Sequence, residues 1–194
     1  MLNTLKGLNF TKGYGLLMRH ADRDRIPKGE LGNDIPINAK GYERSLHFGE
    51  ELSSYPLWDI YASPVSRCVE TGRYISEGYG KQIFIKETVV LGSPGIHICD
   101  SDAAGKLFLE VGFKEIYKRF QREEQLAGFH TPSTILESLN AFMQSRIKPN
   151  QLTLFITHDS LITLYHFALN GKVYTRDKWL GFLEGLLIPK DLKS

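Results

Sequence analysis

The stretch "LLMRHADRDR", residues 16–25, contains the change of character that decides the fold. Its first three residues continue an apolar run from Gly15, which is typical of a short buried strand. Six ionisable side chains then occur between Arg19 and Arg25, and such side chains cannot follow the strand into a core without partners. The strand therefore ends at a polar crevice.

Composition favours one globular domain over residues 1–194, with 42% hydrophobic and 24% charged residues. The formal net charge of +2 is too small to indicate a nucleic acid or a membrane surface as partner. No apolar run is long enough for a signal peptide or a membrane-spanning helix, so we expect a cytoplasmic protein. In that compartment Cys68 and Cys99 are expected to be free thiols.

Strand and helix signals alternate along the whole chain, without an internal repeat or a long linker. Strands joined by helices of this length imply an α/β fold, with a mainly parallel central sheet that is flanked by helices on both faces. The predicted strands are 14–19, 59–62, 82–86, 152–157 and 185–188, and the predicted helices are 38–55, 66–79, 102–125, 132–146 and 159–169.

Polar residues follow three of these strands. Arg19 and His20 come at the end of the first, the stretch 63–67 follows the second, and His158 follows the strand 152–157. Because ligands bind outside the carboxyl ends of the strands in such sheets, the three segments should converge on one crevice.

The residue types in this crevice suit phosphate. Arg19, Arg23 and Arg67 carry forked guanidinium groups that match phosphate oxygens, and three of them can neutralise its charge without a metal or another cofactor. An unprotonated imidazole can accept the phosphoryl group, for which His20 is the better placed histidine. A carboxylic acid must then protonate the leaving group. The candidates are Asp159, beside His158 at the start of a predicted helix, and Glu87, directly after the predicted strand 82–86.

Three sequence blocks resemble those of the histidine phosphatase superfamily, which includes acid phosphatases, phytases and cofactor-dependent phosphoglycerate mutases. The family signature Arg-His-Gly corresponds to Arg19-His20-Ala21, with Arg23 matching the second arginine of the acid phosphatase form. The stretch "YASPVSRCVETG", residues 61–72, resembles the Ser-Pro-x-x-Arg-x-x-x-Thr block. The stretch "LFITHDSL", residues 154–161, resembles the segment with the second pocket histidine.

The resemblance implies a phosphoglycerate mutase-like fold and assigns a role to each matching residue. His20 would be the phosphorylated nucleophile, and Arg19, Arg23, Arg67 and His158 would bind phosphate. The His-Asp pair of the acid phosphatase branch favours Asp159 as proton donor, whereas the mutase branch uses a glutamate after the third strand, which Glu87 could match. Both assignments stay open.

The sequence thus predicts a metal-independent phosphatase that hydrolyses a small phosphomonoester through a phosphohistidine intermediate. The alternatives are a protein phosphohistidine phosphatase and a phosphate-binding module without turnover. A hydrolytic metal site is weaker, because the arginines would repel a cation. Residues 91–129 are where family members vary the cap over the pocket, so we expect substrate choice to be encoded there.

Overall fold

The sheet has five strands, four of them parallel. The computed structural model describes residues 4–191. The strand order is β3-β2-β4-β1-β5, and β5 runs antiparallel to β1 at one edge. The strands are β1 (Tyr14–Arg19), β2 (Leu57–Ala62), β3 (Ile85–Glu87), β4 (Leu152–Thr157) and β5 (Gly185–Pro189). This mainly parallel α/β architecture confirms the predicted fold class.

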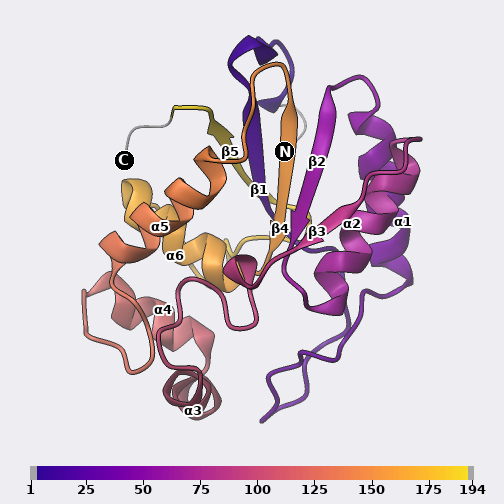
Figure 1. Cartoon of the computed structure of the whole chain (residues 1–194). Helices are drawn as coiled ribbons and strands as arrows, with labels where there is room; N and C mark the ends of the chain where they lie inside the picture. The colour runs from indigo at the N-terminus through magenta and orange to yellow at the C-terminus, as the bar shows by residue number, and fades with distance from the viewer. Residues whose placement is uncertain (1–3, 192–194) are drawn as a thin grey trace.

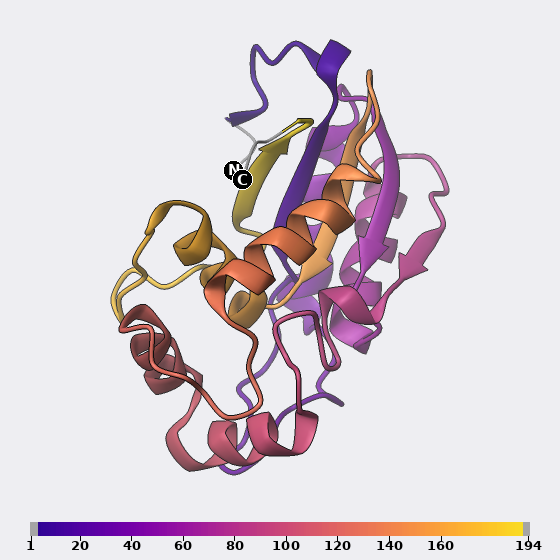
Figure 2. The ribbon, with the colours of Figure 1, turned by 60° about the vertical axis from the view of Figure 1, so that its left-hand side comes forward.

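Helices cover both faces of the sheet, as Figure 1 shows: α1 and α2 lie on one face and α5 and α6 on the other. A further pair, α3 and α4, lies beyond the carboxyl ends of the strands (Figure 2). None of the helices in residues 4–191 is long and apolar enough to cross a membrane. The bounds are α1 (Ala39–Leu52), α2 (Ser66–Gly78), α3 (Ser101–Val111), α4 (Phe113–Gln121), α5 (Pro132–Gln144) and α6 (Asp159–Asn170).

The core is divided by the sheet into two apolar clusters. Leu16 and Met18 of β1 face the cluster under α1 and α2, whereas Leu17 faces the cluster under α5 and α6. This alternation follows from the two-residue period of a strand. Helix α4 also belongs to the second cluster, through Ile116 and Phe120, and is thereby packed against the rest of the domain.

Most predicted elements are present with small shifts at their ends, but the single helix expected over 102–125 is wrong. The structure has two helices there, separated at Gly112. Gly112 has φ of 75°, a left-handed conformation that ends α3. The chain can therefore turn between α3 and α4.

The loop between β1 and α1 is held back against the start of α1. Asp22 is buried and forms ion pairs with Arg44 and, at 3.2 Å, with Lys40. Its carbonyl oxygen accepts a bond from the backbone N–H of Asn38 at 3.0 Å and lies where a Cβ of Gly41 would be, so the approach requires glycine. The loop thereby keeps Arg23 beside the strand ends.

Candidate active site

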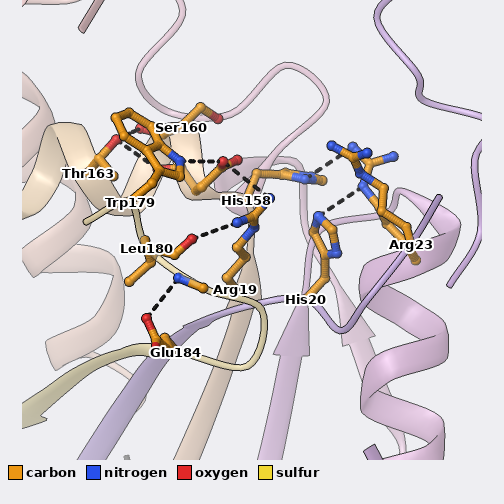
Figure 3. Close-up of polar contacts among 12 residues, drawn as sticks. Arg19, His20, Arg23, His158, Ser160, Thr163, Trp179, Leu180 and Glu184 are labelled. Atoms are coloured by element: carbon orange, nitrogen blue, oxygen red, sulfur yellow. Dashed lines mark hydrogen bonds and ion pairs between the residues drawn. The ribbon is translucent and has the colours of Figure 1, made fainter. Parts of the chain in front are cut away.

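The carboxyl ends of β1, β2 and β4 meet, as the sequence predicts. Arg19 pairs with Thr157 in the β1–β4 register, so His20 and His158 leave adjacent strands at the same level. Their ring centroids are 5.4 Å apart. Figure 3 shows both imidazoles between the guanidinium groups of Arg19 and Arg23.

Arg67 connects the two histidines. It lies in the first turn of α2, is 5% exposed, and donates from Nε to His20 Nε2 and from Nη2 to His158 Nδ1, each at 3.2 Å. Its third nitrogen, Nη1, donates to the carbonyl oxygen of Gly32 at 2.6 Å. The fork of one guanidinium group therefore fixes two imidazoles and the β1–α1 loop together.

The tautomer of His20 follows from its neighbours. Nδ1 lies 2.8 Å from the carbonyl oxygen of Ala21, an acceptor, so Nδ1 carries the proton and Nε2 presents a lone pair to Arg67. Burial, together with the nearby His158 and Arg67, holds the pKa of His20 well below its usual value of 6.5. The ring is therefore neutral at cellular pH, as a nucleophile must be.

His158 has the opposite tautomer. Nδ1 accepts from Arg67, so Nε2–H donates to Ser63 Oγ at 3.0 Å. Burial and Arg67 lower the pKa of His158 to about 3. Gly92 allows this position, because a Cβ there would lie 2.7 Å from His158 Cδ2.

Asp159, at the start of α6, is held from two sides. Its Oδ2 accepts a bond from the Trp179 indole N–H at 2.8 Å and lies 3.3 Å from Arg19 Nη2. Burial alone would raise the pKa of Asp159, but Arg19 and the indole N–H outweigh it and the pKa is lowered. In this arrangement the carboxyl group is ionised.

Arg19 and Arg23 each keep a buried Nε–H without an acceptor among the described residues. Arg19 also donates from Nη1 to the carbonyl oxygen of Leu180 at 2.6 Å and lies over the Phe182 ring, 4.1 Å from its centroid. The guanidinium group of Arg19 is thus held toward Asp159 and the loop before β5. Buried donors without acceptors are uncommon in proteins, and an anion is the partner that would complete both.

A cavity of about 600 Å³ opens beside these groups. His20, Arg23, Arg67, His158 and Asp159 are among the residues that line it, whereas Arg19 and Glu87 are not. Glu87 is exposed and lines a separate hollow next to α2. The physical reason is the strand order: β3 is an edge strand, with β2 between it and the strands that carry the histidines. The structure therefore does not bring Glu87 to the other predicted site residues.

Residues of the 91–129 segment form the far wall of the cavity. Phe108 of α3, Phe113 of α4, and Phe129 all line it. His97 lines it too and is 6% exposed, with a pKa lowered to about 4 by burial and by His130. The 91–129 segment thus lies beside the cavity, where a cap over the phosphate site is expected. That this segment determines the choice of substrate stays a prediction.

The alternative metal site would take its ligands from His20, Asp22, Asp24, His158 and Asp159, and two of these carboxylates have other partners. Asp22 is paired with Arg44 and Lys40, and Asp24 accepts a bond from the side chain of Asn38. Among residues 4–191 no three His, Cys, Asp or Glu side chains gather as a metal site would require.

Both cysteines are free thiols, as the sequence predicts. Cys68 lies beneath the site, with Sγ 3.7 Å from His158 Nε2. Burial raises the pKa of its thiol to about 12, so it is not a nucleophile at neutral pH.

Sequence reasoning missed Trp179, Phe182 and Gly92. The first two lie in the loop before β5 and reach the site through contacts with α6 and β1. No local pattern in a single sequence marks such residues. Gly92 stands in a Gly- and Pro-rich loop that could have been recognised as a close approach of backbone to the site.

Residues 16–89 match the model of the histidine phosphatase superfamily, branch 1. The predicted resemblance to that superfamily is confirmed. The match includes His20, the three predicted phosphate-binding arginines and Glu87, whereas His158 and Asp159 lie beyond it. No curated protein matches the chain.

Several solved structures have the same fold as this chain. A phosphoglycerate mutase from Bacillus anthracis is 15% identical, with a TM-score of 0.60 over 92% of this chain and 89% of that one. Bacillus stearothermophilus YhfR is 19% identical, with a TM-score of 0.57 over 89% and 87%. A mycobacterial glucosyl-3-phosphoglycerate phosphatase is 14% identical, with a TM-score of 0.54 over 83% and 81%. At these identities the likeness shows the phosphoglycerate mutase-like fold.

Proposed function

We propose that the protein is a phosphatase that hydrolyses a small phosphomonoester through a phosphohistidine at His20, without a metal. The observation that carries the proposal is the fixed tautomer of His20. Its Nδ1–H is bonded to the carbonyl oxygen of Ala21, and the lone pair of Nε2 accepts a hydrogen bond from Arg67 Nε, in the place where a phosphoryl group would be attacked. A buried imidazole is thus neutral and oriented before any substrate arrives.

In the first step, Nε2 of His20 attacks phosphorus while the bond to the leaving oxygen breaks. Arg67 transfers its hydrogen bond from Nε2 to a phosphoryl oxygen, and the Nε–H groups of Arg19 and Arg23 find acceptors on the same group. His158 completes the pocket. In the second step, water attacks the phosphohistidine, the P–N bond breaks, and inorganic phosphate leaves.

Asp159 is the proton donor of this proposal, since Glu87 lines another hollow. The carboxyl group is ionised in the free protein, so its proton must enter with the substrate, bound as a monoanion. The phosphate charge and the engagement of Arg19 by phosphate would both raise the pKa of Asp159. The carboxyl group then protonates the leaving oxygen, and the carboxylate later accepts a proton from the attacking water.

The shape of the site supports a small substrate. The histidines lie inside a cavity of about 600 Å³, within the range of small-molecule sites. A phosphohistidine on another protein must reach its enzyme across a protein surface, whereas here residues of the 91–129 segment wall the cavity beside the histidines. A small ester fits this site better than a protein does.

The proposal is tested with 4-nitrophenyl phosphate in the presence of a chelator, at pH values from 4 to 8. We expect turnover that His20→Ala lowers by at least about 10³-fold, because the nucleophile is lost. The lowered pKa of His20 keeps Nε2 unprotonated below pH 6.5, so the acid limb of kcat/KM should lie below that value.

His47→Ala is the matched control. His47 lies on α1, with a side chain 70% exposed, and should be replaced without effect on activity. Loss of all turnover in chelator would refute the metal-free mechanism. Binding of phosphate without any hydrolysis would favour the phosphate-binding module.

A further inference from the structure

Four aromatic rings form one side of the cavity beyond the phosphate-binding groups. This aromatic wall consists of Phe108, Phe113, Phe129 and Trp179, which come from four separate stretches of chain. The rings of Phe113 and Trp179 pack edge to face, with centroids 6.1 Å apart. All four are partly buried and pack on the second apolar cluster. They thus leave a supported apolar surface open to the cavity.

The β1–α1 loop adds apolar side chains to the cavity lining. Ile26 and Leu31 of this loop line the cavity, and Leu31 is 43% exposed. Leu31 is held near the reacting groups, because the carbonyl oxygen of the next residue, Gly32, accepts a bond from Arg67. A bound molecule would therefore meet apolar side chains from this loop and from the aromatic wall.

The aromatic wall is joined directly to the proposed proton donor. Trp179 belongs to the wall, and its indole N–H binds Asp159 Oδ2 at 2.8 Å. The oxygen that receives the proton must lie next to Asp159. The rest of the leaving group then extends from that oxygen along the wall.

We propose that the leaving group is an apolar alcohol or phenol that carries a ring, an inference that rests on the proposed phosphatase function. A ring can pack against the phenyl groups with favourable edge or face contacts. The rings offer no hydrogen bonds to the hydroxyl groups of a polyol, which would depend on the polar residues that also line the cavity, such as Asn33, Ser101 and Lys114.

The experiment compares benzyl phosphate with glycerol 1-phosphate. Both leaving groups are primary alcohols of similar acidity, so a difference in kcat/KM reports on the contacts of the leaving group. We expect benzyl phosphate to be preferred by at least about tenfold, as for other apolar pockets. Phe108→Gln should reduce this preference severalfold, while inhibition by inorganic phosphate stays the same.

Leu109→Gln is the matched control on the same helix. Leu109 is 51% exposed and does not line the cavity, so the preference should be unchanged. Phe113→Gln tests the wall from α4 if Phe108→Gln does not fold. Equal or better use of glycerol 1-phosphate, or a preference that neither wall variant alters, would overturn the assignment and leave the phosphatase standing. No hydrolysis of any ester, 4-nitrophenyl phosphate included, would overturn both proposals.

Discussion

The two sides of the cavity are built by different means. On the side of the strand ends, His20 and Arg67 are 1% and 5% exposed and are bonded to each other and to backbone carbonyl groups. On the side of the 91–129 segment, α3 has one buried residue, Ala104, and meets α4 at a glycine. A preorganised polar network suits the transition state, whereas an apolar wall that is assembled from different elements suits a leaving group. The chemistry and the choice of substrate are therefore separated in space.

Replacing Arg67 should disrupt the polar network at the strand ends and cause the largest loss of activity. A lysine keeps the positive charge but cannot bond both histidines and Gly32 at once. We expect Arg67→Lys to lower kcat/KM for 4-nitrophenyl phosphate by about 10²- to 10³-fold. Arg73→Lys, an exposed position on the same helix, is the control and should be near wild type. If Arg67→Lys leaves kcat/KM as close to wild type as Arg73→Lys does, then only the positive charge of residue 67 is needed.

The side of the strand ends is also the side that sequence predicts well. Apolar runs marked β1 and β4 with correct ends, and the parallel arrangement then required their following residues to meet. Glu87 shows the limit of this reasoning. Glu87 lies at the carboxyl end of its strand, as the histidines follow theirs. The order of the strands, which local patterns do not determine, nevertheless puts Glu87 beside another hollow.

The opposite side is predicted less well, for a physical reason. The apolar spacing over 102–125 fits one helix, and the break depends on a single left-handed residue, Gly112. The aromatic wall depends on contacts between stretches far apart in the chain, such as Phe113 with Trp179. Such contacts are visible in three dimensions and leave no periodic signal in the sequence.

Trp179 contributes a ring to the aromatic wall and a hydrogen bond to Asp159, so its substitution tests how far the two sides of the cavity act separately. Trp179→Phe keeps a ring in the wall and removes the N–H that lowers the pKa of Asp159. That pKa should therefore rise, which moves the alkaline limb of kcat to higher pH. We expect kcat to fall by about tenfold, because the carboxyl group loses the bond that orients it.

Trp58→Phe is the control for this experiment, since Trp58 lies on β2 and is 62% exposed. The same variant leaves Trp179 as the remaining tryptophan, so fluorescence on addition of vanadate would report on the site directly. A pH profile that coincides with that of the wild type would remove Trp179 from the description of the proton donor.

Two glycines of the 91–129 segment should give the smallest effects, of opposite sign. Gly112, with φ of 75°, would hold alanine in a strained conformation, so Gly112→Ala should lower the free energy of unfolding by about 1 kcal/mol. Gly105 lies within α3, and a Cβ there meets nothing within 4 Å. Gly105→Ala should raise that free energy by about 0.5–1 kcal/mol, because alanine is the better helix former. Urea titration measures both. Hydrolysis of 4-nitrophenyl phosphate should change little in Gly112→Ala, since the polar network at the strand ends is untouched. A large loss of activity in that variant would show that the two sides of the cavity are coupled, whereas Gly105 lines the cavity and its variant tests stability alone.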